Sequence, residues 1–171
     1  MMFSTAIWLL RFANWLNWIG AALLTLLLAA LLLASEHFHP AIAGAFEVRG
    51  QAAVDAVWSW LVAACSMAVP VAICVHLALT RLVALLKDAR IGQAFSEMNA
   101  RRLTTVGWAL LAINIVDLAF GQVSVWASAK SGEYFGWSPS MTGWFAVLLL
   151  FLLAKVFREG AAMREDLEGT V

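Results

Sequence analysis

The sequence predicts an all-α integral membrane protein, a bundle of four transmembrane helices with both ends of the chain in the cytoplasm. The first observation is composition: of 171 residues, 63% are hydrophobic and 13% charged, and the mean hydropathy is +0.85. Soluble domains have about 45–50% apolar and about 25% charged residues, so a soluble globular protein is excluded. The other two observations are the four long apolar blocks and the placement of Lys and Arg.

Each apolar block is long enough to span a bilayer, because a helix needs about 20 residues to cross the hydrocarbon core. Three blocks lack charged residues, and the fourth is interrupted once, by Asp117. One acid adds only about 2.5–3.5 kcal/mol to the apparent cost of insertion. We therefore predict a single membrane domain over residues 1–171. It has spans at about 12–35, 56–80, 103–129 and 137–155, a cytoplasmic hairpin at 81–102 and a cytoplasmic tail at 156–171.

The positions of Lys and Arg predict the orientation of the spans. Nine of these 11 residues precede the first span, lie between the second and third spans, or follow the fourth. Only Arg49 and Lys130 lie in the other two connections. Because basic residues accumulate on the cytoplasmic side, the termini and the central hairpin are predicted to be cytoplasmic. Tryptophans near span ends, Trp60 and Trp137 among them, are interpreted as anchors at the headgroup level.

The first span has a second interpretation, as a cleaved signal peptide with the cleavage-like sequence Ala41-Ile42-Ala43. We favour a retained span, because the apolar stretch exceeds the roughly 7–15 residues usual in signal peptides. Residues 35–50 then form an outer loop that includes a short surface helix.

Local signals predict the form of the second span and the hairpin. Pro70 lies inside the span and predicts a kink, because proline removes one backbone hydrogen bond. The helix is expected to continue about two turns beyond the bilayer and to end at Gly92. Ser96 followed by Glu97 is typical of a helix N-cap with an acid in the first turn. The tail is predicted to be a charged helix that ends near Gly169.

The third span carries a polar stripe that is the candidate intramembrane site. Polar and small residues recur there at intervals of three and four, so they share one helix face, which is expected to pack inward. These residues are Asn114, Asp117, Gly121, Ser124 and Ser128, and the candidate site consists of Asn114, Asp117 and Ser124. Ionisable residues in a membrane are functional candidates by default. The structural alternative is that Asp117 bonds a hydroxyl such as that of Ser59 or Ser66.

Enzymatic, cofactor and metal functions have little support. No nucleotide-binding loop, nucleophile elbow or zinc-protease helix occurs, and we expect no cofactor. His76 is the single histidine at membrane depth, so a haem between two histidines is not favoured, and His37 with His39 is weak evidence for a metal site. Net charge is zero, and therefore direct nucleic-acid binding is not expected. The bilayer is the expected partner.

Two segments on the predicted cytoplasmic side carry distinctive motifs. The first segment is Gly92-Gln93-Ala94-Phe95-Ser96-Glu97-Met98-Asn99-Ala100-Arg101-Arg102-Leu103, followed by Gly107-Trp108. The second comprises Val156-Phe157-Arg158-Glu159-Gly160 and Met163–Val171. Together they resemble a bacterial family of four-span membrane proteins, domain of unknown function 2975. The resemblance implies four helices in a bacterial inner membrane. Members are often encoded beside a small helix-turn-helix regulator, so the resemblance suggests a membrane partner of such a transcription regulator.

The leading functional hypothesis is a non-enzymatic regulatory or scaffold protein that binds a cytosolic partner. Its candidate docking residues are Phe95, Ser96, Asn99, Arg101, Arg102, Arg158 and Glu159. Arg101 and Arg102 are expected to pair with Glu159, Glu165 and Asp166 of the tail, which would fix the ends of the bundle. The alternative is a small transporter or channel subunit that uses Asp117. This alternative requires a homo-oligomer, because four helices rarely enclose a pore alone.

Overall fold

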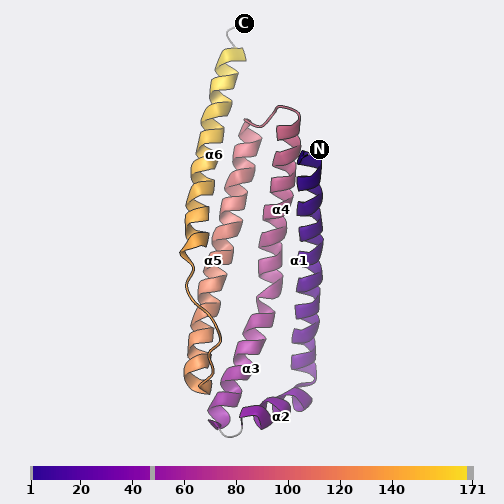
Figure 1. Cartoon of the computed structure of the whole chain (residues 1–171), viewed down its shortest axis with the longest axis vertical. Coiled ribbons are helices and arrows are strands. Elements are labelled where there is room, and N and C mark those ends of the chain that lie inside the picture. Colours follow the sequence, from indigo (N-terminus) through magenta and orange to yellow (C-terminus); the bar gives the residue numbers. More distant parts are fainter. Residues whose placement is uncertain (1, 47–48, 169–171) are drawn as a thin grey trace. The chain divides into compact units, whose positions relative to one another are not determined.

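The computed structural model of the chain is all-helical in the residues that it describes, as the sequence predicts (Figure 1). The backbone is described for residues 2–46 and 49–168, and the side chains for residues 3–46 and 49–164. No strand occurs in these ranges. The helices are α1 (Met2–Leu33), α2 (Ser35–Phe46), α3 (Gln51–Ser66), α4 (Ala68–Arg90), α5 (Glu97–Ser131) and α6 (Met141–Glu168).

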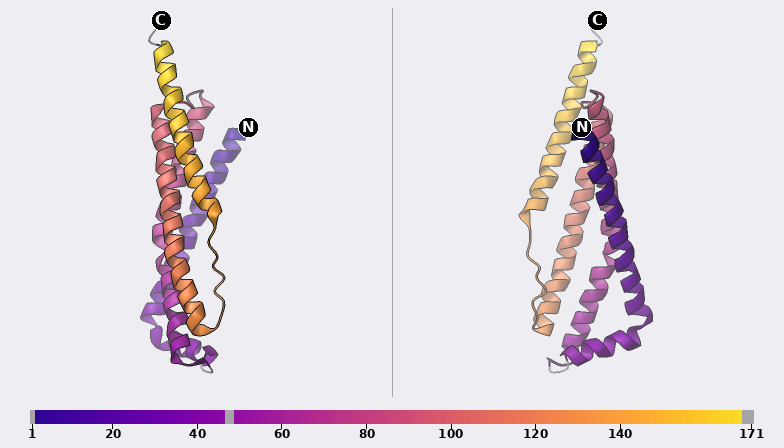
Figure 2. Two further views of the ribbon diagram at one scale, coloured as in Figure 1. Left: turned by 90° about the vertical axis from the view of Figure 1, so that its left-hand side faces the viewer. Right: turned by 45° about the vertical axis from the view of Figure 1, so that its right-hand side comes forward.

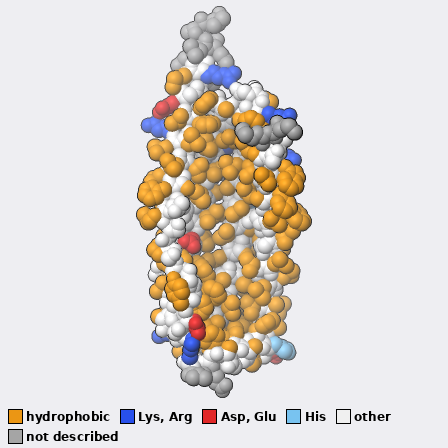
Figure 3. Space-filling model, viewed as in Figure 1, with side chains coloured by type: hydrophobic (Ala, Val, Ile, Leu, Met, Phe, Trp, Pro, Cys, Tyr) orange, Lys and Arg blue, Asp and Glu red, His pale blue; other side chains and the backbone are white. Residues whose placement is uncertain are grey.

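Four helical stretches are long and apolar enough to cross a membrane, which confirms the four-span interpretation. They are Phe3–Leu33, Gln51–Arg90, Glu97–Ser131 and Met141–Arg164. The most apolar 18 residues of each stretch have a mean hydropathy between 1.7 and 2.2. Figure 3 shows hydrophobic side chains over most of the visible face. Lipid is the solvent that such a surface fits.

The buried residues are mostly small, and the large apolar side chains point outward. Ala56, Ala100 and Ala127 are fully buried, whereas Leu33 is 86% exposed and Leu149 is 65% exposed. Small residues allow helix backbones to approach closely in a membrane, and large apolar side chains lose nothing by facing lipid. This distribution is therefore the one expected of membrane helices.

The chain divides into two compact units. The first consists of Met1–Asn17, Ile73–Asn114 and Ser140–Val171, and the second consists of Trp18–Ala72 and Ile115–Pro139. Nine of the 11 Lys and Arg residues belong to the first unit by sequence, and the other two belong to the second. The positive-inside rule therefore predicts that the first unit contains the cytoplasmic ends of the spans.

The second span is interrupted at Met67, between α3 and α4. Pro70 lies one turn later, in the first turn of α4. Proline has no N–H to bond the carbonyl four residues earlier, here that of Ser66, so the helical ladder is broken at this point. Helical bonds continue on either side, from Met67 N to Ala63 O at 3.2 Å and from Val71 N to Met67 O at 3.1 Å. The irregularity predicted from Pro70 is thus present and lies three residues before it.

In the second unit, the chain between α5 and α6 runs back along α5 (Figure 2). Residues 132–140 contain no helix, and the Phe135 backbone N–H donates to Ser128 Oγ at 3.1 Å. Helix α6 begins at Met141, later than the predicted start at 137, because Pro139 disfavours helical backbone in the residue before it. Arg49 Nη1, beyond α2, lies 2.6 Å from Glu133 Oε1 and ties the α2–α3 connection to the α5–α6 connection.

Candidate functional site

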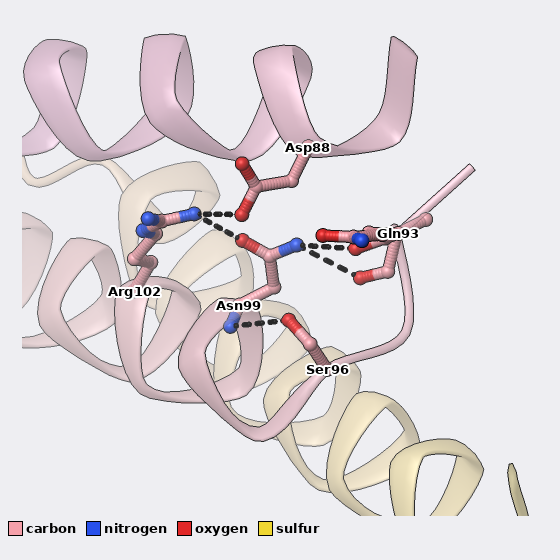
Figure 4. Close-up of polar contacts among 6 residues, drawn as sticks. Asp88, Gln93, Ser96, Asn99 and Arg102 are labelled. Carbon is pink, nitrogen blue, oxygen red and sulfur yellow. Dashed lines mark hydrogen bonds and ion pairs between the residues drawn. The ribbon is translucent and has the colours of Figure 1, made fainter. Parts of the chain in front are cut away.

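The hairpin between α4 and α5 is organised around Asn99, whose side chain is completely buried (Figure 4). Its Nδ2 donates to two loop carbonyls, those of Gln93 and Ala94, each at 3.0 Å. Its backbone N–H donates to Ser96 Oγ at 3.2 Å, which confirms Ser96 as the N-cap of α5. A single residue near the start of α5 therefore satisfies the polar groups of the preceding loop.

Arg102 links Asn99 to the end of α4. Its Nη1 donates to Asn99 Oδ1 at 2.7 Å and also to Asp88 Oδ2. The side chains of Arg102 and Asp88 are only 20% and 28% exposed, so their ion pair is shielded from water. We refer to Asp88, Gln93, Ser96, Asn99 and Arg102 as the Asn99 cluster. It holds α4, the loop and α5 together as one rigid hairpin.

The same hairpin leaves several large apolar side chains exposed. Ile91 is 67% exposed, Met98 is 56% exposed and Phe95 is 50% exposed. Gly92 ends the preceding helix with φ +78°, a conformation that glycine adopts without strain. The predicted end of the helix is thereby confirmed. Ile91 lies in the turn just before this glycine, Phe95 lies in the loop that follows it, and Met98 lies in the first turn of α5.

Phe95 also anchors α6 to the hairpin. Its ring centroid lies 4.9 Å from that of Phe157, and a β-carbon added to Gly160 would lie 3.0 Å from Phe95 Cδ1. Residues from the two sequence segments that carry the family resemblance therefore meet here. Sequence reasoning missed this contact, although Phe95 and Gly160 both belong to the quoted motifs.

Among the described side chains, the expected pairs of Arg101 and Arg102 with Glu159 are replaced by other pairs. Arg101 pairs with Glu97 at 2.6 Å and Arg102 with Asp88, while Glu159 lies 3.9 Å from Lys155. Arg101 and Glu159 each pair with a residue one helical turn away on their own helix, where side chains are neighbours. Arg158 is exposed on α6. The expected tail partners Glu165 and Asp166 lie outside the described side chains.

The structure places the three residues of the intramembrane candidate site in different environments. Asn114 Nδ2 donates to the Leu110 carbonyl of its own helix at 2.8 Å, and its Oδ1 lies against Gly143 of α6. Ser124 is 1% exposed, whereas Asp117 is exposed. The expectation that this stripe packs inward is therefore correct for Ser124 and wrong for Asp117.

The suggested hydroxyl partners of Asp117 are bonded elsewhere. Ser59 Oγ donates to the Asp55 carbonyl and Ser66 Oγ donates to the Ala63 carbonyl, each at 2.8 Å. Serine within a helix commonly bonds a carbonyl one turn earlier. This local partner satisfies each hydroxyl without a second helix.

Two tryptophans interpreted as interfacial anchors pack within the second unit. Trp60 Nε1 donates to Ser124 Oγ at 2.9 Å, and its ring stacks on that of Phe135 at 4.6 Å. Trp137 lies so close to Gly121 that an added β-carbon would be 2.1 Å from its ring. Both rings are half-buried rather than exposed. The glycine in the polar stripe was the sequence signal for this close approach.

Each of the three histidines has a different polar neighbour. His37 Nδ1 lies 3.8 Å from Glu36 Oε1, and His39 Nε2 lies 3.8 Å from Asp55 Oδ1. His76, in α4, forms a 2.9 Å hydrogen bond with Asn14 Oδ1 of α1. Among the described residues, no three His, Cys, Asp or Glu side chains are grouped as metal ligands would be.

Comparison with known proteins places the chain in a family. No curated protein and no solved structure matches it. Residues 48–171 match the family described as protein of unknown function DUF2975. The matched range includes the Asn99 cluster and the contact of Phe95 with Gly160. With most of its length matched, this chain belongs to the DUF2975 family of proteins of unknown function.

Proposed function

We propose that this protein is a non-enzymatic regulatory or scaffold protein of the bacterial inner membrane, and that its hairpin binds a cytosolic protein. The observation that carries the proposal is the exposure of Ile91, Phe95 and Met98 on a hairpin fixed by the Asn99 cluster. Together with Arg101, these three residues form what we call the docking surface. Exposed large apolar side chains close together in the sequence and outside the hydrocarbon core are candidates for a site of interaction.

The charges on either side of the loop support its placement outside the hydrocarbon core. Lys87, Asp88 and Arg90 precede it, and Glu97 and Arg101 follow it. Each such residue at the centre of a bilayer would cost about 2.5–3.5 kcal/mol on insertion scales. The exposed apolar residues between these charges therefore need an explanation other than contact with lipid tails.

The structure suggests different roles for the candidate docking residues. Three of them, Ser96, Asn99 and Arg102, form hydrogen bonds within the hairpin. Their role is therefore to maintain the shape of the docking surface. Phe95 and Arg101 are exposed and can contact a partner. A partner that fits has an apolar groove with an acidic rim, since Arg101 lies beside the apolar residues. Arg158 and Glu159 of α6 extend the charged border.

A helix-turn-helix transcription regulator encoded beside this protein is the first partner to test, because the family resemblance suggests one. The full-length membrane protein would be immobilised in nanodiscs, and binding of the purified regulator measured by biolayer interferometry. The double variant Ile91→Asp/Met98→Asp should lose binding at least about 100-fold, since interface anchors commonly contribute 2 kcal/mol or more. Arg101→Glu should weaken it further if the partner is acidic.

The matched control is Met163→Asp, which makes the same chemical change at an exposed methionine of α6 outside the docking surface. It should bind as the wild type does. Equal binding by wild type and by Ile91→Asp/Met98→Asp would reject the docking surface. Equal loss in the control would show that any added acid disturbs the protein or its association with the membrane.

A further inference from the structure

A cleft lined by both polar and apolar side chains lies between α1 and α4 within the first unit. Its volume is about 240 Å³. The wall from α4 is formed by Leu79, Thr80, Val83, Ala84 and Lys87. Val83, Ala84 and Lys87 lie three, four and seven residues after Thr80 and therefore share one helix face with it. Arg11 is prominent on the facing wall from α1. A cation thus stands on each side of the cleft.

Neither cation has an ion-pair partner within the described part of the chain. Arg11 and Lys87 are both exposed, and no acidic residue lines the cleft. The neighbouring acid on α4, Asp88, forms its ion pair with Arg102. Two cations across a small cleft repel each other unless an anion lies between them. The charge pattern therefore fits an anionic ligand.

The cleft lies at the level of the span ends, and this position indicates that its ligand is a component of the membrane. Arg11 directly precedes the uncharged stretch of the first span, and Lys87 lies two turns beyond Thr80, where the uncharged stretch of the second span ends. Basic side chains at span ends reach the headgroup level. Between the cations, Val83 and Ala84 provide an apolar surface.

We propose that this cleft binds the phosphate of an anionic phospholipid headgroup. The Arg11 guanidinium donates a pair of hydrogen bonds to the phosphate, and the Lys87 ammonium supplies the second charge. Asn14, also in the wall, is held by its bond to His76 and presents its amide nitrogen as a donor. Val83 and Ala84 contact the glycerol and the first acyl carbons.

Native mass spectrometry of the full chain in detergent, titrated with phosphatidylglycerol and with phosphatidylcholine of the same acyl chains, tests this site. Wild-type protein should bind phosphatidylglycerol more tightly. Arg11→Gln/Lys87→Gln should lower the affinity for the first phosphatidylglycerol about 30-fold, which corresponds to about 1 kcal/mol for each cation at the membrane surface. An unchanged affinity would overturn the proposal.

The matched control is Arg81→Gln/Arg90→Gln, which removes the same charge from exposed positions of α4 outside the cleft. It should keep the affinity of the wild type to within about twofold, whereas an equal loss would show only general surface attraction and reject the site. Competition with glycerol phosphate tests whether the ligand is a whole lipid or a free phosphate compound. Competition by glycerol phosphate at the concentrations at which phosphatidylglycerol binds would reject the lipid as ligand.

A second variant keeps both cations of the cleft but fills its volume. Ala84→Phe fills the cleft while Arg11 and Lys87 remain, so it should also lose the preference for phosphatidylglycerol. This variant decides the question if the glutamine variant is not monodisperse. Wild-type affinity in Ala84→Phe would overturn the proposed cleft.

Discussion

The Phe95 ring lies directly over Gly160, with 3.0 Å between Phe95 Cδ1 and the position of a β-carbon on the glycine. This contact joins the hairpin to α6, and Phe157 stacks beside it. A β-carbon at this position would be in tighter than ordinary contact with the ring, which would have to move to admit it. The relationship brings together two residues from separate segments of the range matched by the family.

Replacing Gly160 by leucine should therefore separate α6 from the hairpin. Overpacking of a tight contact commonly costs about 1–3 kcal/mol, and we expect a matching fall in thermal stability in detergent. Ala162→Leu, at an exposed position of the same helix, should change stability by less than about 0.5 kcal/mol. Wild-type stability in Gly160→Leu would show that Phe95 does not anchor α6.

Asn99→Ala should loosen the hairpin. The change leaves the Gln93 and Ala94 carbonyls and one Arg102 donor without their present partner, and an unsatisfied buried polar group costs about 1–3 kcal/mol. Amide exchange in residues 93–98 should accelerate correspondingly. Gln93→Ala is the control, since Gln93 contributes its backbone carbonyl to the cluster and its exposed side chain should be dispensable. Slow exchange in Asn99→Ala would contradict the assigned role.

Gly121→Ala should displace Trp137, because the added β-carbon would lie 2.1 Å from the indole ring. A loss of about 1–3 kcal/mol is expected from the forced movement. In a Trp137→Ala background the same change should cost little, since the obstructing ring is gone. Thermal unfolding of the four proteins in one double-mutant cycle measures this coupling. Additive effects would mean that the two residues are not in contact.

Asp117→Leu should ease insertion of the third span, because Asp117 is exposed on a helix that is otherwise apolar there. On insertion scales the change from Asp to Leu near a helix centre gains about 3–4 kcal/mol. A glycosylation-reporter assay on α5 measures the inserted fraction, with Ile115→Leu as a neutral control at an exposed position. No gain for Asp117→Leu would indicate that the acid lies away from lipid during insertion.

Much of the architecture was predictable because it depends on the solvent and on local backbone chemistry. The four apolar blocks predict the helices whatever their neighbours are, since only helices satisfy their backbone within lipid. Gly92 and Ser96 act on the adjacent turn, so their roles as helix stop and N-cap could also be inferred from the sequence. The family resemblance was likewise carried by contiguous motifs.

Which residues meet was decided by tertiary structure. Helical periodicity places Asp117, Gly121 and Ser124 on one face of α5, yet Gly121 is covered by Trp137, Ser124 bonds Trp60, and Asp117 is exposed. Spacing gives the direction of a side chain but not the neighbour opposite it. The sequence by itself determined which segments form the four long apolar helices and where Gly92 and Ser96 end and begin a helix. The folded chain alone determined the contacts of Phe95, Trp60 and Trp137, because each partner lies on another element of the chain, beyond the reach of local helical spacing.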